Sequence, residues 1–240
     1  MKIKNRLYLN REINLKLIID FNSKQSHYLS KVLRCKLTDH ISVFNEGAEY
    51  LVELLEINSK KAKGIVVKKI KSLRKSSLLT LYFSPIKRTP TEILIQKCSE
   101  IGVNIFQPII MEHSQFSTFN VERLRLIAIE AIEQSGQILV PKINIPIHFN
   151  DFIKNLDSNE NIYACSLSSE SIPISKALSV NRNPNTSILI GPEGDFSEKE
   201  LLILNKNSQI TSVTLGESIL KAETAAVVAA SFIKESSNND

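Results

Sequence analysis

The sequence predicts an α/β fold that follows a smaller β-rich domain. Before residue 73, short alternating apolar runs are separated by turn residues, as in a small sheet or barrel. Beyond residue 76, apolar strand-like segments alternate with longer helical ones, which is typical of an α/β sheet. The 240 residues, 42% of them hydrophobic, suffice for two cores. We therefore expect an N-terminal domain over residues 1–73 and a C-terminal domain over residues 76–240.

The N-terminal domain is expected to contain three strands, at residues 41–44, 50–57 and 64–70. One helix over residues 23–34 accompanies them, because Leu29, Val32 and Leu33 recur at helical spacing. These elements predict a small barrel or sheet.

The C-terminal domain is expected to contain at least five strands, at residues 78–83, 105–111, 162–167, 187–190 and 210–215. Residues 89–92 read Thr-Pro-Thr-Glu, which predicts a capping box with Pro90 at the first helical position. That helix ends at Gly102, and a second helix covers residues 121–135. The pattern predicts a largely parallel sheet with helices on both faces.

Charge is divided unevenly along the chain. Residues 1–75 carry 17 Lys and Arg against 7 Asp and Glu, whereas residues 76–240 carry 13 against 18. Residues 57–91 contain ten basic side chains and no acidic one. A field of this sign and extent attracts a polyanion, so the N-terminal part is expected to bind nucleic acid. The alternative is an ordinary solvated basic surface, which does not explain why the charge gathers at one end.

Several classes of protein are disfavoured. Cys35, Cys98 and Cys165 are too far apart in sequence to indicate a disulfide framework or metal-ligand pairs, and the four histidines show no ligand spacing. We therefore expect no metal. No apolar segment is long enough to cross a bilayer, and the N-terminus lacks the apolar block of a secretion signal. We expect no membrane association and a cytoplasmic location.

Three loops follow the predicted C-terminal strands, at residues 166–169, 191–195 and 216–222. Ligands of open α/β sheets bind beyond the carboxyl ends of the strands, so these loops are the expected site. The second loop has two glycines, which let a ligand approach the backbone closely. It also carries Glu193 and Asp195 but no Lys, which favours a neutral or cationic ligand over a phosphate. Taken singly, each loop is equally an ordinary connection.

The segments beside these loops are well defined. Ser197 and Glu200 predict a capping box, and Phe196 is placed to pack against Leu201 at the start of the same helix. The last helix is apolar on nearly every side over residues 223–230. Such a helix must be buried in a core or in a subunit interface.

Five motifs occur in order along the chain: HYLSKVLR at 27–34, IQKCSEIGV at 95–103, EQSG at 133–136, IGPEG at 190–194, and LG at 215–216 followed by ILKAETA at 219–225. Together they resemble the RsmE-type methyltransferases of the SPOUT superfamily, which methylate N3 of a uridine in 16S ribosomal RNA with S-adenosylmethionine. The resemblance implies a PUA-like N-terminal β-barrel for RNA, a C-terminal domain with a deep trefoil knot, and a homodimer whose pocket lies near the subunit boundary. The implied partner is 16S rRNA or the small ribosomal subunit.

The resemblance also implies site residues. The cofactor S-adenosylmethionine is expected to contact Leu167, Gly191, Glu193, Gly194, Leu215, Gly216, Ile219, Leu220 and Thr224. An adenosine and a sulfonium need no phosphate cradle, which suits a glycine-rich loop without lysine. For Leu215, Ile219 and Leu220, plain core packing is the alternative.

Methylation at N3 requires loss of the N3 proton, so the site needs an acceptor or donors that stabilise the uridine anion. The candidate acceptors are Glu223 and Glu193, and Lys221 is the candidate cation. Glu223 equally suits the N-terminus of a helix, where the dipole favours a carboxylate. Contacts with RNA are expected from Arg6, Lys31, Arg34, Lys87, Arg88, Gln134 and Gln137.

The chain departs from the family pattern at several loop positions. Lys221 and Gln137 stand where Arg is usual, Asp195 replaces a common Gly, and Glu217-Ser218 replaces Pro-Arg. Two alternatives stay open: a SPOUT methyltransferase with another RNA target, and a non-catalytic RNA-binding or ribosome-assembly protein. An unrelated nucleotide-using enzyme is disfavoured because no Gly-Lys-Ser/Thr sequence occurs.

Overall fold

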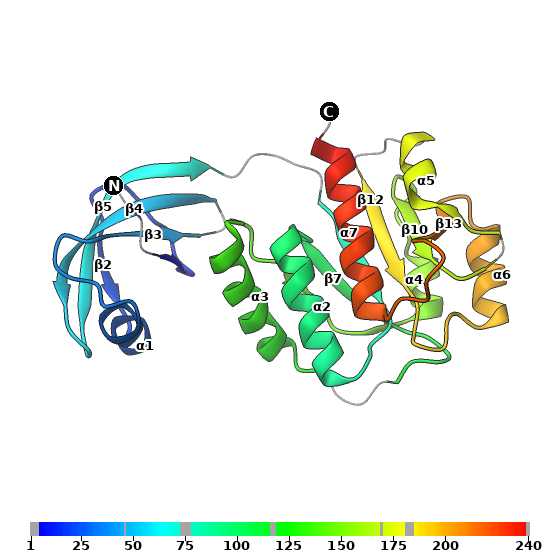
Figure 1. The fold of residues 1–240 in the computed structure, drawn as a ribbon, viewed down its shortest axis with the longest axis horizontal. Helices are drawn as coiled ribbons and strands as arrows, with labels where there is room; N and C mark the ends of the chain where they lie inside the picture. Colours follow the sequence, from blue (N-terminus) through cyan, green and yellow to red (C-terminus); the bar gives the residue numbers. More distant parts are fainter. Residues whose placement is uncertain are drawn as a thin grey trace. The chain divides into compact units, whose positions relative to one another are not determined.

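The computed structural model describes residues 5–45, 47–72, 78–115, 119–168, 170–180 and 185–238 (Figure 1). The chain forms two compact units. Unit 1 comprises Met1–Lys75 and Ile132–Val140, and unit 2 comprises Ser76–Ala131 and Pro141–Asp240. The predicted boundary at residues 73–76 lies outside the described residues. The sequence did not indicate that Ile132–Val140 would pack with the N-terminal unit.

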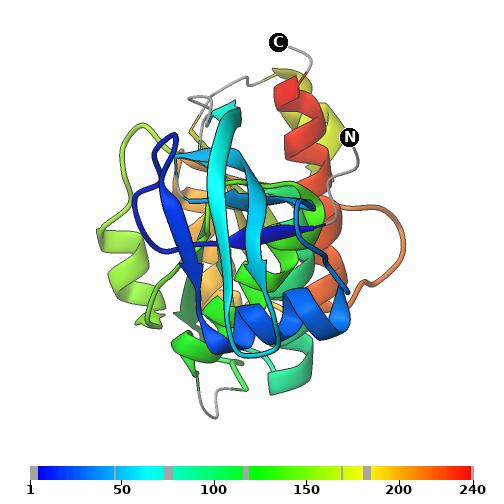
Figure 2. The same ribbon diagram turned by 90° about the vertical axis from the view of Figure 1, so that its left-hand side faces the viewer.

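Unit 1 is built on a five-stranded sheet in the order β1-β3-β4-β5-β2. Its strands are β1 (Arg6–Tyr8), β2 (Ile18–Phe21), β3 (His40–Phe44), β4 (Ala48–Ile57) and β5 (Ala62–Ser72). β1 runs parallel to β3, and the other pairs are antiparallel. The sheet is strongly curved and encloses a core that includes Ile19, Leu29, Ile41 and Val52 (Figure 2). The three predicted strands are confirmed, whereas β1 and β2 were missed because they are only three and four residues long.

The predicted helix over residues 23–34 is not a single α-helix. α1 (Ser23–His27) is followed by a π-helical turn, η1 (Tyr28–Val32), in which the Leu33 amide bonds to the carbonyl of Tyr28, five residues earlier. This wider turn changes the angular spacing of the side chains. Leu29 is buried as expected, but Val32 is exposed.

Unit 2 contains a parallel sheet, as predicted. The strand order is β11-β13-β10-β12-β6-β7-β8, with β9 beside β7, and every pairing is parallel. The strands are β6 (Thr80–Phe83), β7 (Ile105–Ile110), β8 (Lys142–Ile143), β9 (Ile147–His148), β10 (Asn161–Cys165), β11 (Ile172–Pro173), β12 (Thr186–Ile190) and β13 (Ile210–Thr214). All five predicted strands are present.

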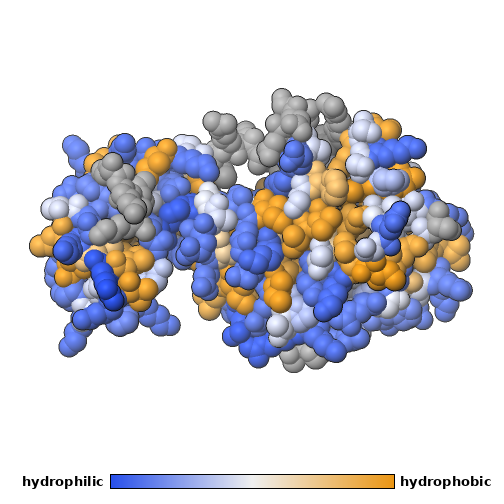
Figure 3. Space-filling view, viewed as in Figure 1, coloured by the Kyte–Doolittle hydropathy of each residue, from blue (hydrophilic) through white to orange (hydrophobic). Residues whose placement is uncertain are grey.

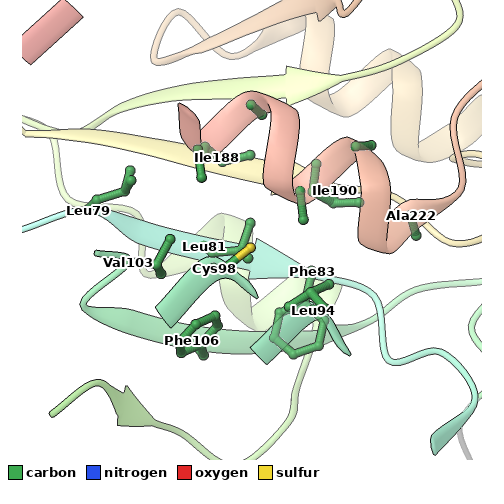
Figure 4. Packing of buried hydrophobic residues seen from close by; sticks show 14 of the residues in the cluster. Leu79, Leu81, Phe83, Leu94, Cys98, Val103, Phe106, Ile188, Ile190 and Ala222 are labelled. Carbon is green, nitrogen blue, oxygen red and sulfur yellow. The ribbon is translucent and has the colours of Figure 1, made fainter. Parts of the chain in front are cut away.

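Helices cover both faces of this sheet. They are α2 (Arg88–Ile101), α3 (Val121–Ser135), α4 (Phe149–Lys154), α5 (Ile174–Val180), α6 (Glu198–Lys206) and α7 (Ala222–Asn238). Alternate side chains of β12 point to opposite faces: Ile188 and Ile190 join the cluster under α2 and α7, while Leu189 joins the cluster with Phe152 and Leu204 of α4 and α6. Figure 4 shows Ile190 and neighbouring residues of the first cluster.

The predicted capping box at the start of α2 is wrong. The helix begins at Arg88, its N-cap is Lys87 without a side-chain bond, and Pro90 occupies the third helical position. Proline is tolerated there because the first-turn amides have no partner within the helix. The hydroxyl of Thr91 instead donates to the carbonyl of Ile86. Glu92 forms ion pairs with Arg88 and Arg123.

α7 is not buried on every side within the chain. Ala226, Ala229 and Ala230 face the core, but Thr224 is exposed and Phe232 is 40% exposed. The small side chains let α7 approach α2 and the sheet closely. Within the described parts of the chain, no helix combines the length and apolarity that crossing a membrane requires.

Candidate functional site

The three predicted loops meet at one edge of the unit 2 sheet. β13, β10 and β12 are neighbours and parallel, so their carboxyl ends lie side by side. A cavity of about 670 Å³ lies among the loops that follow them, and the starts of α2 and α7 contribute Pro90, Ala222 and Ala225 to its wall. The expectation that these loops form one concave site is confirmed.

Most of the predicted cofactor residues line this cavity: Leu167, Gly191, Glu193, Gly194, Leu215, Gly216, Ile219 and Leu220. Thr224 is exposed and does not belong to the lining. Leu167 is 58% exposed and Ile219 is 81% exposed, so neither is a core residue. Leu215 and Leu220 line the cavity and also pack against the core.

The three candidate catalytic residues, Glu193, Lys221 and Glu223, also line the cavity. Lys221 directly precedes α7, and Glu223 lies in its first turn. The dipole of α7 stabilises a carboxylate at this position, so the alternative structural role of Glu223 is also compatible with the geometry.

The glycine-containing loop after β12 is held on both sides. A side chain at Gly191 would come within 3.1 Å of the Phe196 ring, so the absence of a Cβ permits this packing. Phe196 and Leu201 belong to the same apolar cluster, and the direct contact between these two side chains stays a prediction. The capping box of Ser197 and Glu200 is confirmed at the start of α6.

A fourth loop, after β7, also contacts the glycine-containing loop. The amide of Glu112 donates to Oε1 of the buried Glu200 at 2.9 Å, and Nδ1 of His113 lies 3.1 Å from the carbonyl oxygen of Asp195. Nε2 of Gln115 donates to Oε2 of Glu193 at 3.2 Å. These residues were missed, although they follow a predicted strand at the same edge of the sheet.

The charged side chains of the cavity wall suit a neutral or cationic ligand. Among the described residues that line it, Glu193, Asp195 and Glu223 are acidic and Lys221 is basic. Cys165 also faces the cavity, and burial raises the pKa of its thiol to about 12. The thiol therefore stays protonated at neutral pH and contributes a small apolar surface.

The residues expected to contact RNA are divided between the two units. In unit 1, Lys31, Arg34 and Gln134 are exposed, and Gln137 is half-buried. In unit 2, Lys87 and Arg88 are exposed at the start of α2, and Nε of Arg88 lies 2.9 Å from Glu92.

The side chain of Arg6 is held by contacts within unit 1, and its expected contact with RNA stays a prediction. Its side chain is only 15% exposed, and its guanidinium forms an ion pair with Glu49. Further donors reach the carbonyl oxygens of Ile132 at 2.7 Å and Gln137 at 2.8 Å, and the group lies over the ring of Phe44. These donors are therefore used within unit 1.

Comparison with known proteins defines the family. A model of an RNA methyltransferase domain matches residues 74–234, and a model of an RNA methyltransferase PUA domain matches residues 21–67. The "Ribosomal RNA small subunit methyltransferase E" of Rickettsia conorii is 32% identical over 232 residues, which cover 96% of this chain and 95% of the relative. The chain belongs to the ribosomal RNA small subunit methyltransferase E family. The PUA-like nature of the N-terminal domain is thereby confirmed.

Solved structures share the fold of this methyltransferase E family member. The methyltransferase E of Neisseria gonorrhoeae, solved bound to S-adenosyl methionine, aligns with a TM-score of 0.85 at 24% identity and covers 96% of this chain and 97% of its own. A probable rRNA methyltransferase from Porphyromonas gingivalis aligns with a TM-score of 0.84 at 25% identity, covering 98% and 99% of the two chains. The predicted α/β fold of the C-terminal domain and the small β domain that precedes it are confirmed over nearly the whole chain.

Proposed function

We propose that this protein methylates N3 of a uridine in the 16S ribosomal RNA of the small subunit with S-adenosylmethionine. The observation that carries the proposal is the cavity of about 670 Å³, whose wall contains eight of the nine predicted cofactor residues. Family membership supports the ribosomal RNA substrate.

The chemistry of the wall fits S-adenosylmethionine. Leu167, Ile219 and Leu220 offer apolar surface to a flat ring, while glycine backbone at the strand ends can bond to its polar edge. Glu193 is a carboxylate that suits the ribose hydroxyls or the positive sulfonium. When bound, the cofactor supplies the methyl group.

The residues of the chain would position the uridine and deal with its N3 proton. Glu223 or Glu193 would accept the proton, and the ammonium of Lys221 would stabilise the negative charge that develops on the base. Placing N3 in line with the methyl group would account for much of the rate.

The RNA would be gripped by the basic side chains of unit 1 and by Lys87 and Arg88. A base inside folded RNA must leave its stack to reach such a cavity, so contacts with the surrounding phosphates have to offset that cost. The exposed positions of Lys31 and Arg34 support this role.

We further propose that the protein acts as a homodimer in which α7 is covered by a second subunit. Figure 3 shows hydrophobic side chains gathered over α7 and the adjacent part of α2, where Ile93 and Phe232 are exposed. Phe232→Glu is expected to produce a monomer in size-exclusion chromatography with light scattering. Leu202→Glu, at an exposed position on α6, is the matched control. A dimeric Phe232→Glu variant would contradict this interface.

A cytoplasmic location follows from the proposed substrate and agrees with three free cysteines. Cell fractionation tests it.

The domain limits at residues 73 and 76 stay a prediction, which limited proteolysis tests. The trefoil knot likewise stays a prediction, which tracing the chain in an experimental structure tests.

Two measurements test the enzymatic function. Calorimetry is expected to detect binding of S-adenosylmethionine by the purified chain, and its absence would favour a non-catalytic RNA-binding protein. Mass mapping of 16S rRNA from cells that lack the gene is expected to show loss of one N3-methyluridine. Unchanged N3-methyluridine together with loss of another methylated base would instead indicate a different RNA target.

A further inference from the structure

Asp195 has an unusual backbone conformation at the edge of the cavity. Its φ is 60°, in the left-handed region, where residues other than glycine are uncommon and Asp and Asn are the best tolerated. Its amide donates to the carbonyl of Pro192 at 3.0 Å, which closes the turn that contains Glu193 and Gly194. The conformation of Asp195 therefore sets the path of these two cavity residues.

The carboxylate of Asp195 joins this turn to a second loop. Oδ1 accepts a hydrogen bond from the amide of Phe196 at 2.8 Å, and Oδ2 accepts one from the amide of Leu167 at 3.4 Å. The first bond stabilises the left-handed turn locally. The second spans 28 positions in the sequence and links the loop after β10 to the loop after β12.

The backbone carbonyl of Asp195 faces a third loop, because its oxygen lies 3.1 Å from Nδ1 of His113. A single residue thus contacts the loops that follow β7, β10 and β12. Leu167 is exposed at the cavity wall, so packing of its side chain contributes little to holding it in place. The hydrogen bond from its amide to Asp195 therefore contributes more to its position than packing does.

We propose that Asp195 is a positioning residue that preorganises the cofactor cavity. It holds Leu167 at the rim and fixes the turn that presents Glu193 and Gly194. Glycine would adopt the same φ without strain, so the turn alone does not require an aspartate. The carboxylate is needed to hold the two amides. Ordering the loops before binding raises affinity because less conformational entropy is lost on binding. The inference rests on the proposed binding of S-adenosylmethionine.

Two substitutions separate what the backbone conformation of Asp195 contributes to the order of the loops from what its carboxylate contributes. Asp195→Gly keeps the left-handed turn but removes both acceptors. Asp195→Asn tolerates the same backbone and keeps one oxygen for the amide of Phe196. Thr38→Gly is the matched control, since Thr38 also has a positive φ, of 68°, but lies in unit 1.

Calorimetry with S-adenosylmethionine and amide hydrogen exchange of the ligand-free protein test the inference. Asp195→Gly is expected to weaken binding about tenfold, as for loss of a hydrogen bond to a charged acceptor, and to speed exchange at Leu167 and Phe196. Asp195→Asn is expected to retain slow exchange at Phe196 and to bind with intermediate affinity. Thr38→Gly is expected to match the wild type in both measurements.

Wild-type exchange at Leu167 in Asp195→Gly would overturn the inference, and so would an unchanged dissociation constant. If the wild-type chain itself does not bind S-adenosylmethionine, the proposed function fails. The exchange measurement then still decides whether Asp195 couples the loops.

Discussion

The guanidinium of Arg6 donates to both carboxylate oxygens of Glu49, at 2.9 Å from Nε and 3.2 Å from Nη2. The same group also bonds to the carbonyls of Ile132 and Gln137. These bonds attach the end of α3 and the residues after it to the small sheet. This arrangement explains why Ile132–Val140 belong to unit 1.

Replacing Arg6 is therefore expected to destabilise unit 1. Arg6→Ala leaves the buried Glu49 without its cation, and loss of one partner of such a pair costs about 3 kcal/mol. Urea denaturation measures the change in the free energy of unfolding. Arg11→Ala, at an exposed position, is the control and should change it by less than about 0.5 kcal/mol. Equal stability of the two variants would contradict the assigned role of Arg6.

The Glu49 carboxylate makes stability depend on pH in acid. Burial raises its pKa, but hydrogen bonds from Arg6 and Ser42 and the charges of Arg6 and Lys71 outweigh burial, so the pKa lies below its ordinary value of 4.5. The stability that the Glu49 carboxylate contributes is fully present above the unfolded pKa of about 4.5. It is lost as pH falls through the lower pKa of the folded state. Glu49→Gln should flatten the loss of stability below pH 4.5. The same acid dependence in both proteins would show that another group is responsible.

Gly216 is expected to be essential to the shape of the cavity. Its φ is 130°, a backbone conformation that residues with a side chain rarely adopt. Gly216→Ala therefore introduces about 1–3 kcal/mol of local strain. The loop should shift and the affinity for S-adenosylmethionine should fall in calorimetry. Gly136→Ala, with a φ of 80° in unit 1, is strained in the same way and should leave the affinity unchanged. Equal effects of both variants on affinity would mean that Gly216 acts only through general stability.

Lys221 is expected to act in the chemical step. Lys221→Met should lower kcat for RNA methylation by about 100-fold, as for removal of one group that stabilises a developing anion. Affinity for S-adenosylmethionine should change little, because Lys221 is assigned to the base and not to the cofactor. Lys199→Met, at an exposed position on α6, is the control. A loss of cofactor affinity with kcat retained would reverse the assignment.

Glu223→Gln separates the two roles open to that residue. If Glu223 accepts the N3 proton, kcat falls and its dependence on pH changes. If it only complements the dipole of α7, kcat stays constant and the unfolding free energy falls by less than about 1 kcal/mol. We expect the first result in single-turnover methylation assays.

Lys31 is expected to contact an RNA phosphate. Lys31→Ala should weaken RNA binding and reduce the slope of log affinity against log salt by about one. Fluorescence anisotropy over a range of salt concentrations measures both quantities. Lys154→Ala, an exposed position on α4, removes the same charge from unit 2 and should leave the slope unchanged. A slope unaffected by Lys31→Ala would exclude that side chain from the interface.

The local sequence was sufficient to predict an element of secondary structure where a pattern of residues is repeated along the segment. The strands of unit 2 were predicted because buried parallel strands are continuous apolar runs. The start of α6 was predicted because Ser197 and Glu200 form bonds within one turn. The start of α2 was not, because Glu92 bonds to Arg123, which is distant in the sequence.

The sequence by itself determined the α/β character of the C-terminal part, the basic character of the N-terminal part, and the strand-end loops that form the cavity. These properties depend on composition and on neighbours a few residues apart. Only the tertiary structure decided that Arg6 forms an ion pair with Glu49 and that Thr224 lies outside the cavity wall. It also decided that Asp195 contacts the loops that follow three different strands. Each of these depends on hydrogen bonds or packing between distant segments, and such contacts leave no periodic signal in the sequence.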